Sequence, residues 1–404
     1  MKPFELFRNV AFVLASFLFS ASFVSCSDDE TEEPPFDSET KQTILMYMPW
    51  SGSGIYTYFL NNISAFEQAV ENNHGFDGNA LMVFISENET RSNLIRIVYE
   101  NGECRRDTLR QYIYSDCNYT TSAGIAEILN DAFSEAPAQS YALTVGCHGM
   151  GWIPVGTSVT TRAQMFKAYG HQPKYLTRYF GHDSDSRYQT DITTLAEGIE
   201  ATGKKMNFIL FDDCYMSNIE TAYNLRNVTD YLIASTCEIM IDGMPYTEIG
   251  KDLFNNDYEA VVNDFYSFYS AFEPPCGTIG VTDCRETEQM ANIMRQINTA
   301  FPDGVDDLNS IQALDGYTST IFFDFGDYVS KLCSDRALFN AFNAQLDRLV
   351  PYKSNTETFY SMFWRENNGF REINAYSGIT ISDPTVNSSV VPVINQTEWY
   401  MATH

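Results

Sequence analysis

One stretch of the chain, Phe208–Met216, constrains the fold more than any other. It consists of a short apolar run, Phe-Ile-Leu-Phe, that ends abruptly at two aspartates and a cysteine. Apolar residues then recur three and four positions apart as far as Tyr223. This pattern is typical of a buried parallel strand that leads into a helix. The chain is therefore expected to be an α/β protein, with Cys214 at the carboxyl end of a strand and at the N-terminus of a helix.

The position of Cys214 is consistent with a chemical role. Open α/β sheets bind their ligands beyond the carboxyl ends of the strands. The amide dipoles at a helix N-terminus also favour a thiolate over a thiol. Cysteine is nevertheless among the residues most often buried for packing alone. This stretch by itself leaves a structural cysteine as an equal alternative.

A second stretch, Tyr141–Trp152, favours the chemical interpretation. Its apolar run ends at His148, which has glycines on its C-terminal side that allow a sharp turn and a close approach of the backbone to a substrate. A histidine and a cysteine at two strand ends of one parallel sheet could converge, as a thiolate nucleophile and its general acid/base require. A lone histidine is more often structural, but this pair is complementary. Cys147 is a poor partner for His148, because neighbours on a strand face opposite sides.

The remaining pattern alternates strands and helices. Strands are expected at 43–48, 80–85, 231–235 and 278–281, a hairpin at 94–98 and 107–112, and helices at 55–71, 121–133 and 192–199. Thr194 and Glu197 have the spacing of a capping box. Such alternation predicts a mostly parallel sheet with helices on both faces. Residues 41–284 are expected to form this domain. Residues 285–404 are expected to be chiefly helical and to return a strand, Ser377–Ser382, to the sheet.

The N-terminus has the features of an export signal. Lys2 and Arg8 precede an apolar stretch, Val10–Val24, that is too short to span a bilayer. The sequence Phe-Val-Ser-Cys ending at Cys26 resembles a bacterial lipobox, which implies that Cys26 is diacylated and becomes the mature N-terminus. A plain secretory signal is the alternative. Residues 1–25 are thus interpreted as a lipoprotein signal peptide and residues 26–40 as an acidic, flexible tether.

Charge and spacing argue against several other functions. The formal net charge of −28 repels nucleic-acid phosphates and anionic membrane surfaces. The sequence has no GxSxG elbow, no GxxxxGK[ST] phosphate loop and no zinc-type cysteine spacing. His182–Asp185 resembles a metal cluster, but Arg187 and Tyr188 stand where a calcium loop needs an oxygen ligand and glycine. Outside the cytoplasm, Cys276 could pair with Cys284, or Cys104 with Cys117.

Two sequence blocks carry a family resemblance. Cys147–Trp152 and Phe211–Met216, followed by Glu220, resemble the His-Gly-x-Gly-Trp and Asp-x-Cys-x-Met…Glu blocks of the clostripain family. These are cysteine peptidases related in fold to caspases, gingipains and legumains. The resemblance extends from about Thr43 to Ser382. Two departures are Asp213, where the family usually has alanine, and Cys147, where serine is common.

The resemblance implies a caspase-like three-layer sandwich. His148 would be the general acid/base and Cys214 the nucleophile, with an oxyanion hole formed by the N–H groups of Gly149 and Cys214. The family cleaves after arginine or lysine, and its acidic pocket residues correspond to Asp212 and Asp242. A helix cap for Asp212 and a turn role for Asp242 are the structural alternatives. No cofactor is expected. Calcium is possible only through the resemblance, with no site identified.

Together these features predict an exported, lipid-anchored cysteine endopeptidase. The Ser-Asp-Asp-Glu after Cys26 resembles an acidic surface-exposure signal, which implies the outer membrane or cell surface of a Gram-negative bacterium. Proteins or peptides with basic residues are the expected partners, with the membrane reached only through the lipid and no nucleic acid bound. The alternatives are a catalytically silent surface-binding lipoprotein and a cell-wall peptide amidase with the same dyad. Residues 156–190 carry basic residues that the enzyme could itself cut.

Overall fold

The computed structural model describes residues 40–49, 55–115, 118–157 and 189–404. The chain divides into two compact units, Met1–Asp37 and Ser38–His404, and all described residues belong to the second. Cys26, the signal peptide and most of the tether therefore lie outside the described residues. Within the described residues, no helix combines the length and apolar character needed to cross a bilayer.

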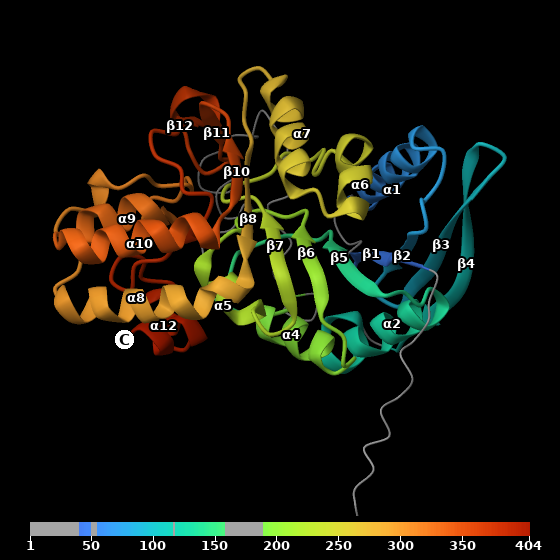
Figure 1. Cartoon of the computed structure of the whole chain (residues 1–404), viewed down its shortest axis with the longest axis horizontal. Helices are drawn as coiled ribbons and strands as arrows, with labels where there is room; N and C mark the ends of the chain where they lie inside the picture. The colour runs from blue at the N-terminus through green and yellow to red at the C-terminus, as the bar shows by residue number, and fades with distance from the viewer. Residues whose placement is uncertain (1–39, 50–54, 116–117, 158–188) are drawn as a thin grey trace, which may run out of the picture. The chain divides into compact units, whose positions relative to one another are not determined.

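A nine-stranded mixed sheet forms the centre of this unit (Figure 1). Its order is β10-β8-β7-β6-β5-β1-β2-β3-β4. The strands are β1 Gln42–Met48, β2 Ala80–Asn88, β3 Arg91–Glu100, β4 Glu103–Ile113, β5 Ser140–Val145, β6 Met206–Phe211, β7 Thr229–Ala234, β8 Thr278–Asp283 and β10 Tyr352–Asn355. The five consecutive strands β7, β6, β5, β1 and β2 are parallel, whereas the β3–β4 hairpin and the β8–β10 pair add antiparallel edges. The mostly parallel sheet is confirmed.

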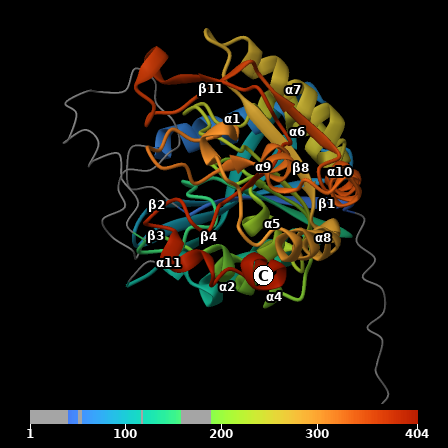
Figure 2. The same ribbon diagram turned by 90° about the vertical axis from the view of Figure 1, so that its left-hand side faces the viewer.

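Helices cover both faces of the sheet (Figures 1 and 2). One face carries α1 Tyr56–Asn72, α6 Tyr246–Asn255 and α7 Tyr258–Ser270, and the other carries α2 Ser122–Glu135, α4 Ile192–Glu200, α5 Ile219–Leu225 and α8 Thr287–Ala300. Side chains of a strand alternate between the faces. In β1, Ile44 and Met46 pack in the core under α1, and Leu45 and Tyr47 in the core under α2. Because both faces are buried, these strands read as continuous apolar runs.

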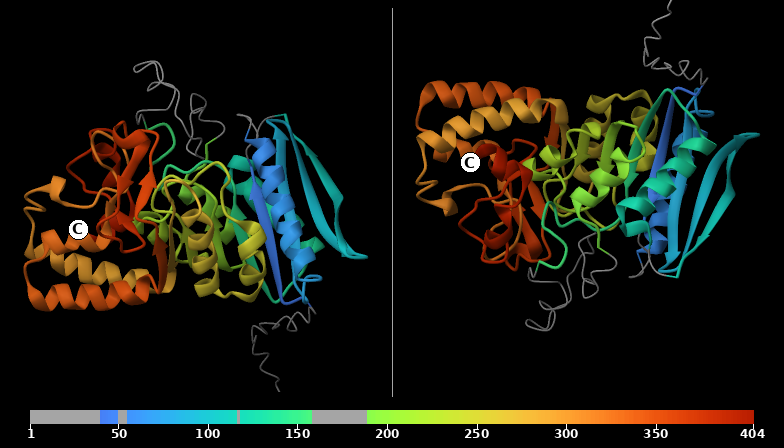
Figure 3. Two further views of the ribbon diagram at one scale, coloured as in Figure 1. Left: turned by 90° about the horizontal axis from the view of Figure 1, so that it is seen from above. Right: turned by 90° about the horizontal axis from the view of Figure 1, so that it is seen from below.

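The C-terminal segments gather at the β10 edge, away from the β3–β4 hairpin (Figure 3). They comprise α9 Phe325–Leu332, α10 Arg336–Leu349, α11 Val391–Ile394, α12 Glu398–Thr403, and the short strands β9 Phe323–Asp324, β11 Thr358–Tyr360, β12 Phe370–Glu372 and β13 Thr380–Ile381. Single 3-10 turns lie at Asn118–Thr120, Cys284–Glu286, Leu308–Ser310 and Glu366–Gly369.

The prediction that Ser377–Ser382 joins the large sheet is wrong. Only Thr380–Ile381 is a strand, and it pairs with β9, whereas the strand returned to the sheet is β10. The stretch cannot pair with β8 because β10 occupies that edge of the sheet. It packs against the loop after β6 instead, where the Ser217 hydroxyl donates to the carbonyl oxygen of Gly378 at 2.8 Å. Gly280 of β8 has no room for a Cβ beside that same carbonyl.

Two local details also differ from the sequence-based expectations. The helix after residue 190 begins at Ile192 with Asp191 as its N-cap, so the capping box at Thr194 is wrong. The Asp191 carboxylate accepts instead from the N–H of Val155 at 2.6 Å. Helices α6 and α7 were not predicted. The residues of α7 have low helix propensity, although its buried residues recur at helical spacing.

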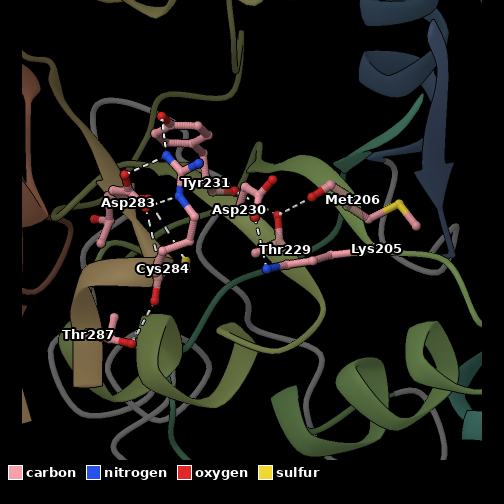
Figure 4. Close-up of polar contacts among 10 residues, drawn as sticks. Lys205, Met206, Thr229, Asp230, Tyr231, Asp283, Cys284 and Thr287 are labelled. Atoms are coloured by element: carbon pink, nitrogen blue, oxygen red, sulfur yellow. Dashed lines mark hydrogen bonds and ion pairs between the residues drawn. The ribbon is translucent and has the colours of Figure 1, made fainter. Parts of the chain in front are cut away.

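The end of the sheet opposite the predicted site carries paired charged side chains (Figure 4). Lys205 and Asp230 form an ion pair at 2.9 Å. The Arg285 guanidinium lies over the Tyr231 ring and donates to Asp283. Since β8 runs antiparallel to β7, its last residues lie beside the first residues of β7 here.

The length of β8 excludes one of the two predicted disulfides. Cys276 and Cys284 flank β8 and are both buried and free. A six-residue strand spans about 20 Å, far beyond the separation a disulfide can bridge, so this pairing is wrong. Cys104 is also free, its thiol directed to the Glu67 carbonyl oxygen at 3.6 Å. Its predicted partner Cys117 lies outside the described residues.

Candidate active site

His148 and Cys214 follow neighbouring parallel strands. Val145, the last residue of β5, pairs with Phe211, the last residue of β6, and each predicted catalytic residue comes three positions later. The segments beyond the two strands are in contact. A Cβ on the buried Gly149 would overlap the carbonyl oxygen of Cys214 and lie 3.0 Å from the Cβ of Asp213. The structure thus brings His148 and Cys214 to the same end of the sheet, beyond the carboxyl ends of β5 and β6.

The nucleophile candidate Cys214 is fully buried, and its sulfur accepts a hydrogen bond from the backbone N–H of Ile239 at 3.3 Å. An N–H directed at sulfur stabilises the thiolate, the form that attacks carbonyl carbon. As a thiol, Cys214 would donate to the carbonyl oxygen of Ile239, which lies 3.9 Å from the sulfur. The loop after β7 therefore supplies a hydrogen-bond donor to the sulfur.

The expected helix N-terminus at Cys214 is wrong. Helix α5 begins at Ile219, and its N-cap is Asn218, whose side-chain oxygen accepts from the N–H of Thr221 at 2.7 Å. A helix cannot begin at Cys214 because Tyr215 has a φ of 62°, in the left-handed region. Cys214 therefore lies in the loop between strand and helix, and the dipole of α5 does not explain its ionisation.

The two departures from the family pattern contact each other. The carboxylate of Asp213 accepts from the N–H of Cys147 at 2.7 Å, and its second oxygen lies 3.3 Å from the Cys147 sulfur. One carboxylate therefore joins the loop that carries His148 to the loop that carries Cys214. Cys147 is thus engaged by Asp213.

The turn after His148 is held from the C-terminal part of the chain. Trp152 donates its indole N–H to the Ser382 hydroxyl at 2.8 Å, and the Ser382 N–H donates to Glu220 at 2.9 Å. Gly151 has a φ of 62° and no room for a Cβ beside the Phe322 ring. Burial raises the pKa of Glu220 to about 8, although the N–H of Ser382 acts in the opposite direction. The turn geometry therefore depends on glycine and on a buried carboxyl group.

The predicted specificity residues meet at one loop. Asp212 is fully buried, and its Oδ1 accepts from the N–H of Met244 at 2.8 Å, so the helix-cap alternative for Asp212 is wrong. Asp242 lies two residues earlier on the same loop and is exposed. Asn62 of α1 donates to the carbonyl oxygen of Asp242 at 3.0 Å. The loop 241–244 thus brings the exposed Asp242 toward the buried Asp212, which lies two residues before Cys214.

Comparison with known proteins agrees with this geometry. Residues 47–335 match the profile of the clostripain family, Peptidase_C11. The chain belongs to the clostripain family. It is a cysteine peptidase, and the predicted α/β sandwich is the caspase-like architecture of this family.

Solved structures of this family resemble the chain closely. A secreted C11 cysteine protease from Bacteroides thetaiotaomicron, iotapain, is 48% identical over 90% of this chain and 99% of its own, with a TM-score of 0.80. An inactive zymogen C11 protease from Parabacteroides distasonis is 25% identical over 90% of this chain and 98% of its own, with a TM-score of 0.73. A clostripain from B. thetaiotaomicron, solved with a peptide inhibitor, is 55% identical over 56% of this chain and 99% of its own, with a TM-score of 0.52. The search of curated proteins found no match.

The candidate site of this clostripain-family protein includes groups that the sequence analysis missed. The Ile239 N–H has no sequence signal, because almost every residue carries such a group. Glu238 lies in the loop that follows β7, and its role became visible only through its contacts. Among the described residues, no group of three or more His, Cys, Asp or Glu side chains could hold a metal ion. His182–Asp185 and most of 156–190 lie outside the described residues.

Proposed function

We propose that this clostripain-family peptidase is an exported endopeptidase that cleaves after arginine or lysine with His148 and Cys214 as its dyad. The observation that carries the proposal is the contact of the His148 loop with the Cys214 backbone at neighbouring strand ends. The Ile239 N–H on the Cys214 sulfur adds support, because a nucleophilic cysteine needs a group that stabilises its thiolate.

Each group has a defined role in the proposed reaction. His148 takes the proton of the Cys214 thiol, and the thiolate attacks the carbonyl carbon of the peptide bond. The N–H groups of Gly149 and Cys214 donate to the oxyanion, a contribution of roughly 3 kcal/mol per donor. His148 then protonates the leaving amine and later activates the water that hydrolyses the thioester.

Asp212 and Asp242 would supply the basic specificity. A carboxylate in a partly desolvated pocket pairs with guanidinium or ammonium through charge-assisted hydrogen bonds. Asp212 contacts the loop 241–244, and Asp242 belongs to it. The B. thetaiotaomicron clostripain was solved with the inhibitor BTN-VLTK-AOMK, whose peptide part ends in lysine. The expected partners are therefore proteins and peptides with basic residues, and no cofactor is invoked.

We also propose export and lipid anchoring. Residues 1–25 would be removed, Cys26 would carry the acyl chains, and residues 26–40 would tether the enzyme to the outer membrane or cell surface. The peptidase itself would span residues 41–284, supported by 285–404. One solved relative is described as a secreted protease, which agrees with export. The charge of −28 argues against nucleic-acid binding.

Labelling with an arginyl acyloxymethyl ketone tests the dyad. Wild type should be modified on Cys214, whereas Cys214→Ala and His148→Ala should not react. Cys284→Ser is a matched control, since it removes another buried, free thiol at the opposite end of the sheet. Label found on Cys147 in the wild type would refute the assignment of the nucleophile.

A peptide panel tests the specificity independently of the label. Matched substrates ending in Arg, Lys, Gln and Ala should be cleaved by wild type with a preference for Arg and Lys. A preference for Gln or Ala would refute the basic pocket while leaving the dyad intact. Cleavage of cell-wall peptides alone would replace the endopeptidase proposal by an amidase.

A further inference from the structure

A buried carboxylate, Glu238, lies between two residues that contact the nucleophile loop. The carbonyl oxygen of Cys237 accepts from the N–H of Tyr215 at 3.0 Å. On the other side of Glu238, the Ile239 N–H donates to the Cys214 sulfur at 3.3 Å. The peptide units on both sides of Glu238 therefore hold Cys214 and the residue that follows it.

The Glu238 side chain is fixed by donors from two parts of the chain. Its Oε1 accepts from the hydroxyl of Tyr215 at 2.9 Å, the hydroxyl of Ser361 at 2.6 Å and the N–H of Met362 at 3.0 Å. Ser361 and Met362 directly follow β11, more than a hundred positions along the chain. Three donors directed at one side-chain oxygen favour the ionised carboxylate, which only accepts hydrogen bonds. A C-terminal segment thus reaches the immediate surroundings of the nucleophile.

Tyr215 needs this support because of its backbone. Its φ of 62° is unfavourable for a residue with a Cβ. Two interactions of the side chain offset this cost. The hydroxyl donates to Glu238, and the ring stacks on Phe322 with centroids 5.0 Å apart and planes 10° apart. If the hydroxyl contact is lost, the residue directly after Cys214 is held less firmly.

We propose that Glu238 is a positioning residue for Cys214. It holds the Ile239 N–H against the sulfur and keeps Tyr215 in its left-handed conformation, and Ser361 and Met362 anchor it from the C-terminal part. The thiolate state of Cys214 therefore depends on side chains that belong to neither member of the dyad. The inference rests on the proposed role of Cys214 as the nucleophile.

The test keeps charge constant. The ionisable groups around this network are His148 on the neighbouring loop, Asp212 and Asp213 before Cys214, Glu238, Asp315 and Tyr317 facing Tyr215, and Arg371, which interacts with Asp315 and Tyr215. Burial raises the pKa of Tyr215 well above its usual value, so its hydroxyl is neutral. Glu238 is left in place, because removing its negative charge would by itself favour the thiolate. Tyr215→Phe and Ser361→Ala each remove one donor to Glu238 without changing any of these charges.

The readout is the titration of Cys214 in the mature chain, followed by the ultraviolet absorbance of the thiolate. Each variant is measured against the same variant carrying Cys214→Ala, so that the other cysteines cancel. Tyr215→Phe and Ser361→Ala should each raise the titration midpoint by about half to one pH unit, a threefold to tenfold loss of thiolate below the midpoint. The control Tyr328→Phe removes a matched contact, a buried tyrosine hydroxyl that donates to Asp383 at 2.8 Å, and should leave the midpoint unchanged.

The outcomes separate this inference from the proposed function. Unchanged midpoints in both Tyr215→Phe and Ser361→Ala would overturn the positioning role, as would an equal shift in Tyr328→Phe. The titration needs no substrate. If the shifts appear but the wild type cleaves no basic peptide, the positioning role stands and the proposed function fails. If the wild type cleaves such peptides and the midpoints do not move, only the positioning role fails.

Discussion

Replacing Glu220 by glutamine should remove a large pH dependence from the stability of this protein. Glu220 lies in the first turn of α5 and is almost fully buried. Its Oε1 accepts from the N–H of Ser382 at 2.9 Å, and its Oε2 has no hydrogen-bond partner among the described residues. Burial raises the pKa of this carboxyl to about 8 from a reference value of 4.5. The folded protein therefore holds this proton more tightly than the unfolded chain.

The sign and size follow from proton linkage. The stabilising contribution of protonated Glu220 is fully present below about pH 4.5 and is lost as the pH rises through about 8, because the unfolded chain releases the proton earlier. A shift of about 3.5 units at about 1.4 kcal/mol per unit corresponds to about 5 kcal/mol. This is an upper limit, since the site can relax and admit water once ionised. A loss of a few kcal/mol is expected.

Denaturant unfolding of wild type and Glu220→Gln measures this effect. The comparison isolates one group, because every other carboxylate titrates equally in both proteins. At about pH 4 the two free energies of unfolding should be similar, since the carboxyl group is then protonated in the folded protein and largely protonated in the unfolded chain. At about pH 9 the variant should be more stable by a few kcal/mol. Glu103→Gln, at an exposed position that begins β4, is the control and should follow wild type throughout.

A constant difference between wild type and Glu220→Gln from acidic to alkaline pH would refute the reasoning. It would mean that the carboxyl ionises in the folded protein as it does in the unfolded chain. A difference that grows toward acidic pH would reverse the sign and would show that the folded protein binds the carboxylate form. Either result would show that Glu220 is not held as a neutral, buried group beside the turn that contains Trp152.

The remaining predictions concern the site, its processing and the anchor. Asp242→Asn should lower kcat/KM for arginyl peptides about tenfold or more and for neutral peptides much less; equal losses across a matched substrate series would contradict a basic pocket. Asp213→Ala leaves the Cys147 N–H without its acceptor and should cost about 1–3 kcal/mol of stability, with a smaller loss for Asp213→Asn; an unchanged unfolding midpoint for both would show that this contact contributes nothing. Cys26→Ser should move the protein from the detergent phase to the aqueous phase, and a variant that still enters detergent would exclude the lipid anchor. Wild type should cut itself within residues 156–190 into two associated fragments, whereas Cys214→Ala should remain one chain; a fully active single chain would contradict this.

Much of the scaffold could be predicted from the sequence. The buried strands read as apolar runs because both faces of a parallel sheet are covered. The ends of β5 and β6 are marked by a glycine and by an aspartate, where the apolar run stops. These local signals were sufficient to place His148 and Cys214 at strand ends, and their two blocks were sufficient to indicate the family.

The prediction that Cys214 lies at a helix N-terminus was wrong. The spacing of apolar residues placed it at a helix N-terminus, but Tyr215 has a left-handed backbone and Asn218 caps the helix. Apolar spacing reports which residues are buried and does not report where helical hydrogen bonding begins. The sequence patterns placed His148 and Cys214 after two strands of one sheet, and the structure shows that these strands, β5 and β6, are neighbours.

What the sequence determined about this protein is therefore local: which segments are strands, and which reactive side chains follow them. Only the tertiary structure decided what surrounds the nucleophile. The N–H of Ile239, 25 positions away, donates to the Cys214 sulfur, and the hydroxyl of Ser361, 123 positions away, donates to Glu238. Backbone amides are chemically alike along the chain, so no residue pattern singles one out. Its role arises only when packing of the core places that one N–H against the sulfur.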